Sequence, residues 1–341
     1  MKLLITGAFG NIGRAILDEA CRRGHEVTVL EKDSKLTRKL ARKYKRKVSK
    51  VLFGDIRHYP TVLEAVSGQE GVVHLAGIIP PYSEKNRELC MDVNLKGTKH
   101  VVSAILETGN MASLVFASTV TVTGFTQHLE PPVTRNHPYI RVNNYNESKI
   151  EAEKHIRGSE LRFYCITRLG AVMPTIAKYS LKSMEYAYEM PYQSRVEIIT
   201  DRDVATAQLN AVEKLSDGTL ESGNIYLLGG GTRCRMIYGD FISRFFKALG
   251  LKPPEKSLFT KDASFLDWMD TDEGQCVLAY QKDSSEDFYR TLRNQYKVLL
   301  PLIKLFKGLV RHIIVKKSAY YRLKVRPAHA KRKAYSAHKV V

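Results

Sequence analysis

Short apolar runs alternate with amphipathic segments through the first half of the chain, and this alternation strongly constrains the fold. The runs are rich in Val, Ile and Leu, which is typical of strands buried on both faces of a parallel sheet. Parallel strands need crossover connections, so the amphipathic segments are expected to be helices that cover both faces of an α/β sheet. Strands are expected at 2–6, 26–30, 50–53, 71–77, 113–119 and 162–170, and helices at 11–23, 60–67, 88–108 and 145–157.

A glycine-rich loop, "TGAFGNIG" (6–13), follows the first strand directly and supplies Gly7, Gly10 and Gly13. Glycines at such a turn let the backbone approach a pyrophosphate, and the N-terminus of the following helix favours its negative charge. The spacing is G-x-x-G-x-x-G, whereas the general dinucleotide fingerprint is G-x-G-x-x-G. A glycine turn without a ligand is the alternative, but the strand–loop–helix context favours a dinucleotide site.

Glu31 closes the second strand, eighteen residues after Gly13. A carboxylate at this place can accept hydrogen bonds from an adenosine ribose and would repel a 2′-phosphate, which favours NAD. Lys32, Lys35 and Arg38 follow at once and could tolerate a phosphate, so NADP stays open. An exposed acid at the end of a strand is the alternative interpretation of Glu31.

Tyr145 and Lys149 lie four residues apart in the polar segment "NNYNESKIEAEK" (143–154). This spacing puts both side chains on one face of a helix. A nearby ammonium favours the phenolate and lowers the pKa of a phenol from about 10 towards neutrality. The pair therefore predicts a general acid–base that works near pH 7, with a surface tyrosine beside a solvated lysine as the alternative.

The cysteines, the possible metal ligands and the hydropathy of the chain argue against a metal site and a transmembrane helix. The five cysteines are scattered and form no C-x-x-C, which indicates a reducing compartment and no structural zinc. The histidines and carboxylates form no metal-ligand constellation, so no metal is expected. The first residues lack a signal-peptide pattern and no apolar run reaches about 18 residues, so we expect a cytoplasmic protein without a transmembrane helix.

Several motifs together resemble one family. The glycine loop, "GDIR" (54–57), "HLAG" (74–77), Asn94, "STVTVTG" (118–124) and the Tyr145/Lys149 pair occur in the order seen in extended short-chain dehydrogenases/reductases. The chain is thereby similar to the NAD-dependent epimerase/dehydratase family, the UDP-glucose 4-epimerase-like proteins. The resemblance extends to about residue 290 through 200–207, 225–231 and 266–281.

The resemblance implies a role for each matching residue. Tyr145 would be the acid–base, Lys149 would lower its pKa and hold the nicotinamide ribose, and Thr119 would hydrogen-bond the reacting oxygen. Asp55 and Ile56 would lie by the adenine, and Asn94 would support the active-site helix. The implied cofactor-binding set is Gly7, Phe9, Gly10, Asn11, Ile12, Gly13, Glu31, Lys32, Asp55, Ile56, Leu75, Ala76, Gly77, Asn94, Ser118, Tyr145 and Lys149.

The resemblance also implies a domain organisation. A Rossmann-like, doubly wound domain would occupy 1–170 and be completed by about 196–231. A small substrate-binding subdomain would comprise 171–195 and 232–290, and a basic amphipathic tail would occupy 291–341. A homodimer through the helices at 88–108 and 145–157 would be the assembly.

Two departures from the family pattern and the composition of one loop bear on the reaction and the substrate. Val120 and Thr121 stand where sugar dehydratases carry an Asp-Glu pair, which argues against dehydration. Arg195 is one residue out of register with the arginine that grips a nucleotide diphosphate, which counts against a sugar-nucleotide substrate. The loop 175–195 is rich in aromatic and Met side chains, which either wall an apolar pocket or pack the small domain: Tyr179, Met184, Tyr186, Tyr188, Met190 and Tyr192.

The net charge of +19 comes mainly from two segments. Residues 291–341 carry fourteen Lys or Arg and no Asp or Glu, and 32–50, expected to form a solvated basic helix, carry ten basic residues and one Asp. Within the tail, 296–317 is expected to form a basic amphipathic helix that Pro301 could start, and one interpretation is that this helix lies on an anionic membrane at its cytoplasmic face. Packing on the body or on a dimer mate is the alternative. Nucleic acid, considered for 326–335, is not expected because no binding module accompanies that segment.

Three functions follow from these residues. The first is an NAD-dependent sugar or nucleotide-sugar epimerase, and the second is a dehydrogenase or reductase of a hydroxylated lipid or other apolar alcohol at a membrane surface. The third is a non-catalytic dinucleotide-binding or assembly protein, which the presence of both Tyr145 and Lys149 disfavours. Both enzymatic functions need a small-molecule carbinol substrate and removal of its hydroxyl proton as the hydride leaves.

Overall fold

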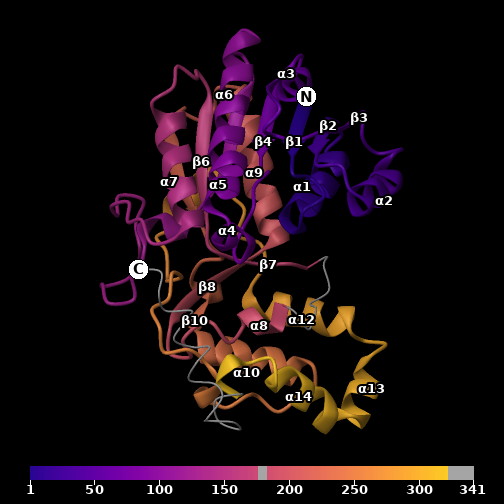
Figure 1. Cartoon of the computed structure of the whole chain (residues 1–341), viewed down its shortest axis with the longest axis vertical. Helices are drawn as coiled ribbons and strands as arrows, with labels where there is room; N and C mark the ends of the chain where they lie inside the picture. Colours follow the sequence, from indigo (N-terminus) through magenta and orange to yellow (C-terminus); the bar gives the residue numbers. More distant parts are fainter. Residues whose placement is uncertain (176–182, 322–341) are drawn as a thin grey trace.

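A seven-stranded parallel sheet forms the centre of the larger of two lobes in the computed structural model, which describes residues 1–175 and 183–321 (Figure 1). The strand order is β3-β2-β1-β4-β5-β6-β9. The order reverses direction between β1 and β4, and ligands bind at such a switch point in open α/β sheets. The strands are β1 (Lys2–Thr6), β2 (Glu26–Glu31), β3 (Lys50–Phe53), β4 (Gly71–His74), β5 (Ser113–Thr119), β6 (Tyr164–Leu169) and β9 (Asn224–Leu228).

Helices cover both faces of this sheet, which confirms the predicted doubly wound α/β fold. α1 (Asn11–Arg22) and α9 (Asp201–Ser216) pack together on one face, and α3 (Tyr59–Val66), α6 (Gly97–Glu107) and α7 (Asn144–Arg157) cover the other. Their buried apolar side chains form two cores on opposite faces of the sheet. The segment between β2 and β3 forms α2 (Lys35–Tyr44), largely exposed as expected for a solvated basic helix.

Two elements of the structure differ from the expected ones in their type or their boundaries. The helix expected at 88–108 consists of α5 (Arg87–Met91), a π-helical turn (Asp92–Lys96) and α6. The strand expected at 71–77 ends at His74, and the next backbone N–H groups, of Leu75 and Ala76, bond to Thr6 at the end of β1.

The smaller lobe is built on a three-stranded sheet in the order β10-β8-β7. Its core is rich in aromatic side chains from α10 and α12. The strands are β7 (Ala171–Met173), β8 (Arg195–Thr200) and β10 (Arg235–Ile237), and the helices are α8 (Ser183–Tyr186), α10 (Tyr238–Ala248) and α12 (Ser285–Gln295). β8 lies in this sheet, so 196–200 belongs to the smaller lobe, whereas α9 and β9 are part of the larger one. The short helices α4 (Tyr82–Lys85) and α11 (Asp272–Leu278) are associated with the larger lobe.

The aromatic loop mostly packs this lobe. Met184 and Tyr188 are buried in its core, and Met190 and Tyr192 pack against it. These contacts support the packing interpretation of the loop over a pocket wall. Tyr179 and the segment 326–335 lie outside the described residues.

The tail forms two short helices, α13 (Leu300–Leu305) and α14 (Lys307–Val315), instead of one continuous helix. Pro301 lies in the first turn of α13, as expected for a helix start. One face of the pair packs on the smaller lobe through Ile314 and Val315, which confirms the packing alternative for that face. In the part of the chain that the structure describes, no helix is long and apolar enough to cross a membrane.

Candidate active site

The glycine loop lies at the carboxyl end of β1, where the strand order reverses. Gly7 has a φ of +71°, and its N–H donates to the Leu30 carbonyl at 3.1 Å. A Cβ on Gly13 would lie only 2.3 Å from the Gly7 carbonyl oxygen. No side chain caps α1, so N–H groups of its first turn are open to an anion. Asn11 and Ile12 begin this helix, whereas the Phe9 ring is buried against Tyr44.

Replacing Gly13 with alanine is expected to weaken dinucleotide binding at least tenfold and to destabilise the protein by roughly 1–3 kcal/mol. The physical reason is the contact with backbone atoms, which have little room to yield. Titration calorimetry with NAD and thermal melts measure both effects. Gly308→Ala is the control, since nothing lies within 4 Å of its Cβ position, and it should be neutral or slightly stabilising. Unaltered NAD affinity in Gly13→Ala would contradict the phosphate-cradle interpretation.

Glu31 is tied to the glycine loop and is not a free acid at a strand end. Its Oε2 accepts a hydrogen bond from the Phe9 N–H at 2.9 Å. Burial raises the pKa of its carboxyl above the usual value. Lys32 beside it is exposed, and Arg38 is held by Asp33 at 2.6 Å.

The residues expected near the adenine are held by local contacts. Both carboxylate oxygens of Asp55 accept hydrogen bonds from the Arg57 guanidinium at 2.8–2.9 Å, which lowers the pKa of Asp55 to about 2. Ile56 is buried against Gly97, the first residue of α6. Asp55 therefore carries its negative charge at neutral pH at this edge of the sheet.

Asn94 ties the loop after β4 to α7. Its side chain accepts from the Ile78 N–H at 2.8 Å and donates to the Ile78 carbonyl at 3.0 Å. It also donates to the Ser148 hydroxyl at 2.9 Å and so contacts α7, the helix that carries Tyr145 and Lys149. Gly77 lies directly against it, since a Cβ there would be 3.0 Å from the Asn94 Oδ1. Asn94 thus positions Leu75, Ala76 and Gly77 relative to α7.

The structure brings Tyr145, Lys149 and Thr119 together where β5 ends and α7 begins. The Tyr145 phenol lies beside Thr119, whose side chain acts to lower the pKa of the phenol. The Lys149 Nζ is buried and donates to the Ala117 carbonyl at 2.7 Å. Glu84 on α4 accepts from the backbone N–H groups of Asn144 and Tyr145 and so fixes the start of α7.

The expected lowering of the Tyr145 pKa is not found in this structure. Burial raises the pKa of the Tyr145 phenol to about 12, although the Thr119 side chain opposes the shift. Burial also lowers the pKa of Lys149 to about 8, while the nearby Glu153 opposes that change. Desolvation is therefore the largest cause of both pKa shifts.

Ser118 points away from Thr119 because successive residues of a strand face opposite ways. Its hydroxyl donates to Glu153 on α7, so the structure assigns it a buried partner and no direct place at the cofactor. The Glu153 carboxylate also accepts from Arg168 on β6 and from the Tyr139 hydroxyl, each at 2.8 Å. Both charged groups of this network are fully buried. The sequence analysis missed it, although Glu153 follows Lys149 by four residues on the same helix face.

Replacing Lys149 with methionine is expected to stabilise the protein at pH 7 by about 1–2 kcal/mol. The drop in pKa from 10.5 to about 8 corresponds to about 3 kcal/mol of unfavourable charge burial, and the lost bond to Ala117 returns part of it. The unfolded chain binds more protons between pH 8 and 10.5, so wild-type stability should rise with pH in that window. Urea unfolding across pH 7–11 measures the rise, which Lys149→Met should remove. Lys154→Met, at an exposed position of α7, is the control.

His74, in the "HLAG" motif, is a core residue. It is fully buried between Thr6 and Thr98, whose hydroxyls lie 2.7 and 3.0 Å from its ring nitrogens. Burial lowers the pKa of its imidazole to about 3. It is therefore neutral and takes no part in the acid–base chemistry.

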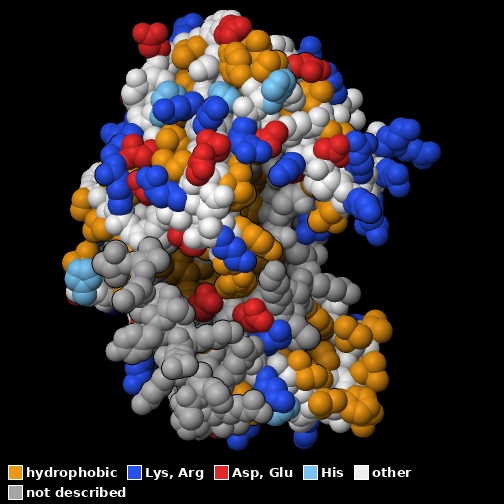
Figure 2. Space-filling view, viewed as in Figure 1, with side chains coloured by type: hydrophobic (Ala, Val, Ile, Leu, Met, Phe, Trp, Pro, Cys, Tyr) orange, Lys and Arg blue, Asp and Glu red, His pale blue; other side chains and the backbone are white. Residues whose placement is uncertain are grey.

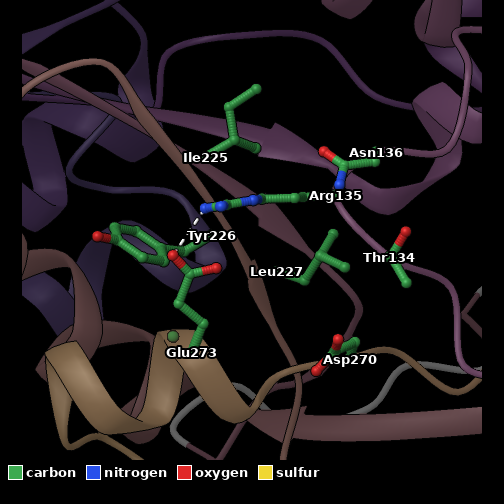
Figure 3. A pocket seen from close by; sticks show the side chains of 9 residues that line it. Thr134, Arg135, Asn136, Ile225, Tyr226, Leu227, Asp270 and Glu273 are labelled. Atoms are coloured by element: carbon green, nitrogen blue, oxygen red, sulfur yellow. Dashed lines mark hydrogen bonds and ion pairs between the residues drawn. The ribbon is translucent and has the colours of Figure 1, made fainter.

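A pocket of about 160 Å³ lies elsewhere, along the edge strand β9 (Figure 3). Arg135 and Glu273 point toward one another in it and form an ion pair at 2.7 Å. None of the predicted catalytic or cofactor-binding residues lines this pocket. It is thus separate from the site built on α7 and the glycine loop.

The fold and the Tyr-x-x-x-Lys site define a protein of the extended short-chain dehydrogenase/reductase class. Residues 4–260 match the model of the 3-beta hydroxysteroid dehydrogenase/isomerase family. The chain belongs to this family of enzymes.

Individual relatives match over limited stretches. The chain is 31% identical over 171 residues to a 3-beta-hydroxysteroid dehydrogenase of Mycolicibacterium neoaurum, covering 46% of this chain and 43% of that protein. It is 32% identical over 90 residues to the human 3 beta-hydroxysteroid dehydrogenase type 7, covering 26% and 22% of the two chains. A UDP-glucose 4-epimerase of Klebsiella pneumoniae is 32% identical over 130 residues, 36% of this chain and 93% of that protein. The chain thus matches less than half the length of these two dehydrogenases.

Solved structures share the fold at low identity. A UDP-glucose-4-epimerase from Stenotrophomonas maltophila, with bound NAD and formylated UDP-arabinopyranose, superposes with a TM-score of 0.72 at 20% identity, covering 89% of this chain and 99% of that one. The UDP-glucose 4-epimerase from Bifidobacterium longum, in complex with NAD+ and UDP, gives 0.71 at 18% identity, covering 87% and 98%. At these identities the likeness shows the fold.

Proposed function

We propose that this protein is an NAD-dependent dehydrogenase or reductase acting at a carbinol carbon of a largely apolar alcohol of the hydroxysteroid type. The observation that carries the chemistry is the placement of Tyr145 beside Thr119, with Lys149 buried one helical turn from Tyr145. The substrate class is supported by the family of the chain and by the state of two arginines in the smaller lobe.

Tyr145 and Thr119 have different roles in the transfer of the substrate's hydroxyl proton. NAD, when bound, supplies the hydride acceptor. The Tyr145 oxygen takes the hydroxyl proton during oxidation and returns it during reduction. The Thr119 hydroxyl steadies the oxygen on which charge develops. Because the pKa of the Tyr145 phenol is about 12, the phenol is protonated at neutral pH and suited to ketone reduction, and alcohol oxidation should accelerate as the pH rises.

The contacts of Glu31 and Arg38 favour NAD over NADP as the cofactor. Glu31 is fixed beside the glycine loop, where its carboxylate suits a ribose hydroxyl and repels a phosphate. Arg38 is committed to Asp33 and lies over the Phe53 ring, which leaves it less available to a 2′-phosphate. The NAD in the related solved structures supports the same choice.

Two arginines in the sheet of the smaller lobe are already paired with carboxylates. Arg195 binds both oxygens of Asp267, at 2.6 and 2.9 Å, and also donates to backbone carbonyls. Arg235 binds the buried Glu197 at 2.8 Å. Guanidinium groups held in this way are poorly placed to bind a nucleotide diphosphate. We therefore place the dehydrogenase or reductase first and the nucleotide-sugar epimerase second, the reverse of their order in the sequence analysis.

A nucleotide-sugar epimerase is the second candidate function. The epimerase of Klebsiella pneumoniae, matched over nearly its whole length, and the fold of the solved epimerases favour it. The same acid–base pair serves both reactions, because an epimerase oxidises and then reduces one carbinol.

Three measurements on purified protein distinguish the candidates. We expect NAD-dependent oxidation of a 3β-hydroxysteroid, followed as NADH absorbance, and no conversion of UDP-galactose to UDP-glucose. Mass analysis of nucleotide released on denaturation should find an exchangeable site, not one filled with tightly held NAD. Epimerisation with retained NAD would replace the proposal by the second candidate, and NAD binding without turnover of either substrate would point to the non-catalytic alternative.

A further inference from the structure

The tail helices leave a continuous apolar surface exposed to solvent. The side chains of Val298 and Leu305 are 86% and 73% exposed. Figure 2 shows hydrophobic side chains gathered at the lower right, over α13 and α14 of Figure 1. We call this surface the tail patch, formed by Val298, Leu302, Leu305, Phe306, Leu309 and Ile313.

The tail patch is held in a fixed orientation by the opposite side of the same helices. Ile303 and Val310 pack on the core of the smaller lobe, and Ile314 and Val315 are buried in it. The Arg311 guanidinium donates to the carbonyls of Lys252 and Pro253 at 3.2 and 3.3 Å. The exposed apolar side chains are therefore presented by a docked element of the fold.

Basic residues flank the tail patch. Lys297, Lys304 and Lys307 are exposed beside it, and the chain carries no Asp or Glu from residue 291 to its end at residue 341. A second copy seated on the patch with two-fold symmetry would bring equally basic surfaces together, which is unfavourable. An anionic lipid surface would bury the apolar side chains and attract the lysines at once.

We infer that the tail patch docks the protein peripherally onto an anionic membrane surface, with α13 and α14 lying in the interface. Leu305, Phe306 and Leu309 enter the boundary of the acyl chains, and the flanking lysines contact the phosphate and carboxylate groups of the lipids. This inference concerns a surface outside the active site and does not depend on the proposed reaction.

Vesicle sedimentation with the full-length protein tests the inference. Two kinds of vesicle are used, one of phosphatidylcholine and one in which part of it is replaced by phosphatidylserine. We expect binding to the anionic vesicles at least about tenfold tighter than to the neutral ones, and weaker binding as salt is raised. The double variant Leu305→Glu/Leu309→Glu should bind anionic vesicles at least about tenfold more weakly. Met111→Glu, at an exposed apolar residue outside the tail, should bind like the wild type.

Controls separate docking from its alternatives. Thermal melts check that the glutamate variant folds, and Leu302→Ser/Leu305→Ser, which alters no charge, is measured beside it. Failure of the wild type to bind anionic vesicles overturns the inference. It is also overturned if binding survives both double variants, since capture would then be purely electrostatic. Conversion of a dimer to a monomer by the variants, with vesicle binding unaffected, would assign the patch to a second copy of the chain.

Discussion

Replacing Tyr145 with phenylalanine is expected to lower turnover by roughly 10²–10⁴-fold while leaving NAD affinity nearly unaltered. The change removes the one oxygen that we assign to take the hydroxyl proton, yet it keeps the ring and the start of α7, which Glu84 caps. The measurement is kcat for the alcohol that the wild type oxidises, together with NAD titration by fluorescence.

Tyr59→Phe is the matched control for this substitution. The Tyr59 hydroxyl bonds to Glu107 on the protein surface, outside the site, so its loss should leave kcat within about twofold of the wild type. Equal turnover in Tyr145→Phe and the wild type would refute the acid–base assignment. A simultaneous loss of NAD affinity would instead indicate a distorted site.

Replacing Glu153 with glutamine is expected to destabilise the protein by about 3–5 kcal/mol. The change leaves the buried Arg168 charge without its counter-charge, although an amide can keep some of the hydrogen bonds from Ser118 and Tyr139. It also removes the negative charge that favours charged Lys149, so the pKa of Lys149 should fall further. Urea unfolding at pH 7 measures the loss of stability.

Two further variants show whether the buried charge is the cause. Glu151→Gln lies on the same helix, but its partners Arg141 and Lys154 are largely exposed, so it should cost no more than about 1 kcal/mol. Glu153→Gln/Arg168→Met removes both charges and should recover a large part of the lost stability. If the double variant is no more stable than Glu153→Gln alone, the unpaired arginine is not the source of the effect.

Local patterns in the sequence were sufficient for the architecture of the larger lobe. The buried parallel strands, the helices between them and the Tyr145–Lys149 spacing depend on periodicities that a sequence displays directly. The position of the glycine loop after β1 could also be predicted, because its glycines are visible in the sequence. Gly7 has a positive φ and Gly13 lies close to backbone atoms, and both conditions favour glycine.

The features that escaped prediction depend on contacts between distant segments. The family resemblance placed Ser118 among the cofactor-binding residues, and only the packing of α7 on β5 and β6 shows that it bonds Glu153. The position of β8 in the small sheet follows from pairing with β7 and β10 and not from its own residues. The helix break at Phe306 has no glycine or proline at that residue to announce it, and the two helices differ in direction to fit the smaller lobe.

The clamping of α7 at several points has a consequence for heat inactivation. The helix that carries Tyr145 and Lys149 is fixed at its start by Glu84, in its first half by Asn94 through Ser148, and further along by the buried pair of Glu153 and Arg168. Such a helix cannot melt locally without exposing the charges and the apolar core beneath it. Loss of activity on warming should therefore coincide with the cooperative unfolding of the larger lobe, so that the catalytic lifetime of the protein at any temperature is set by its global unfolding rate.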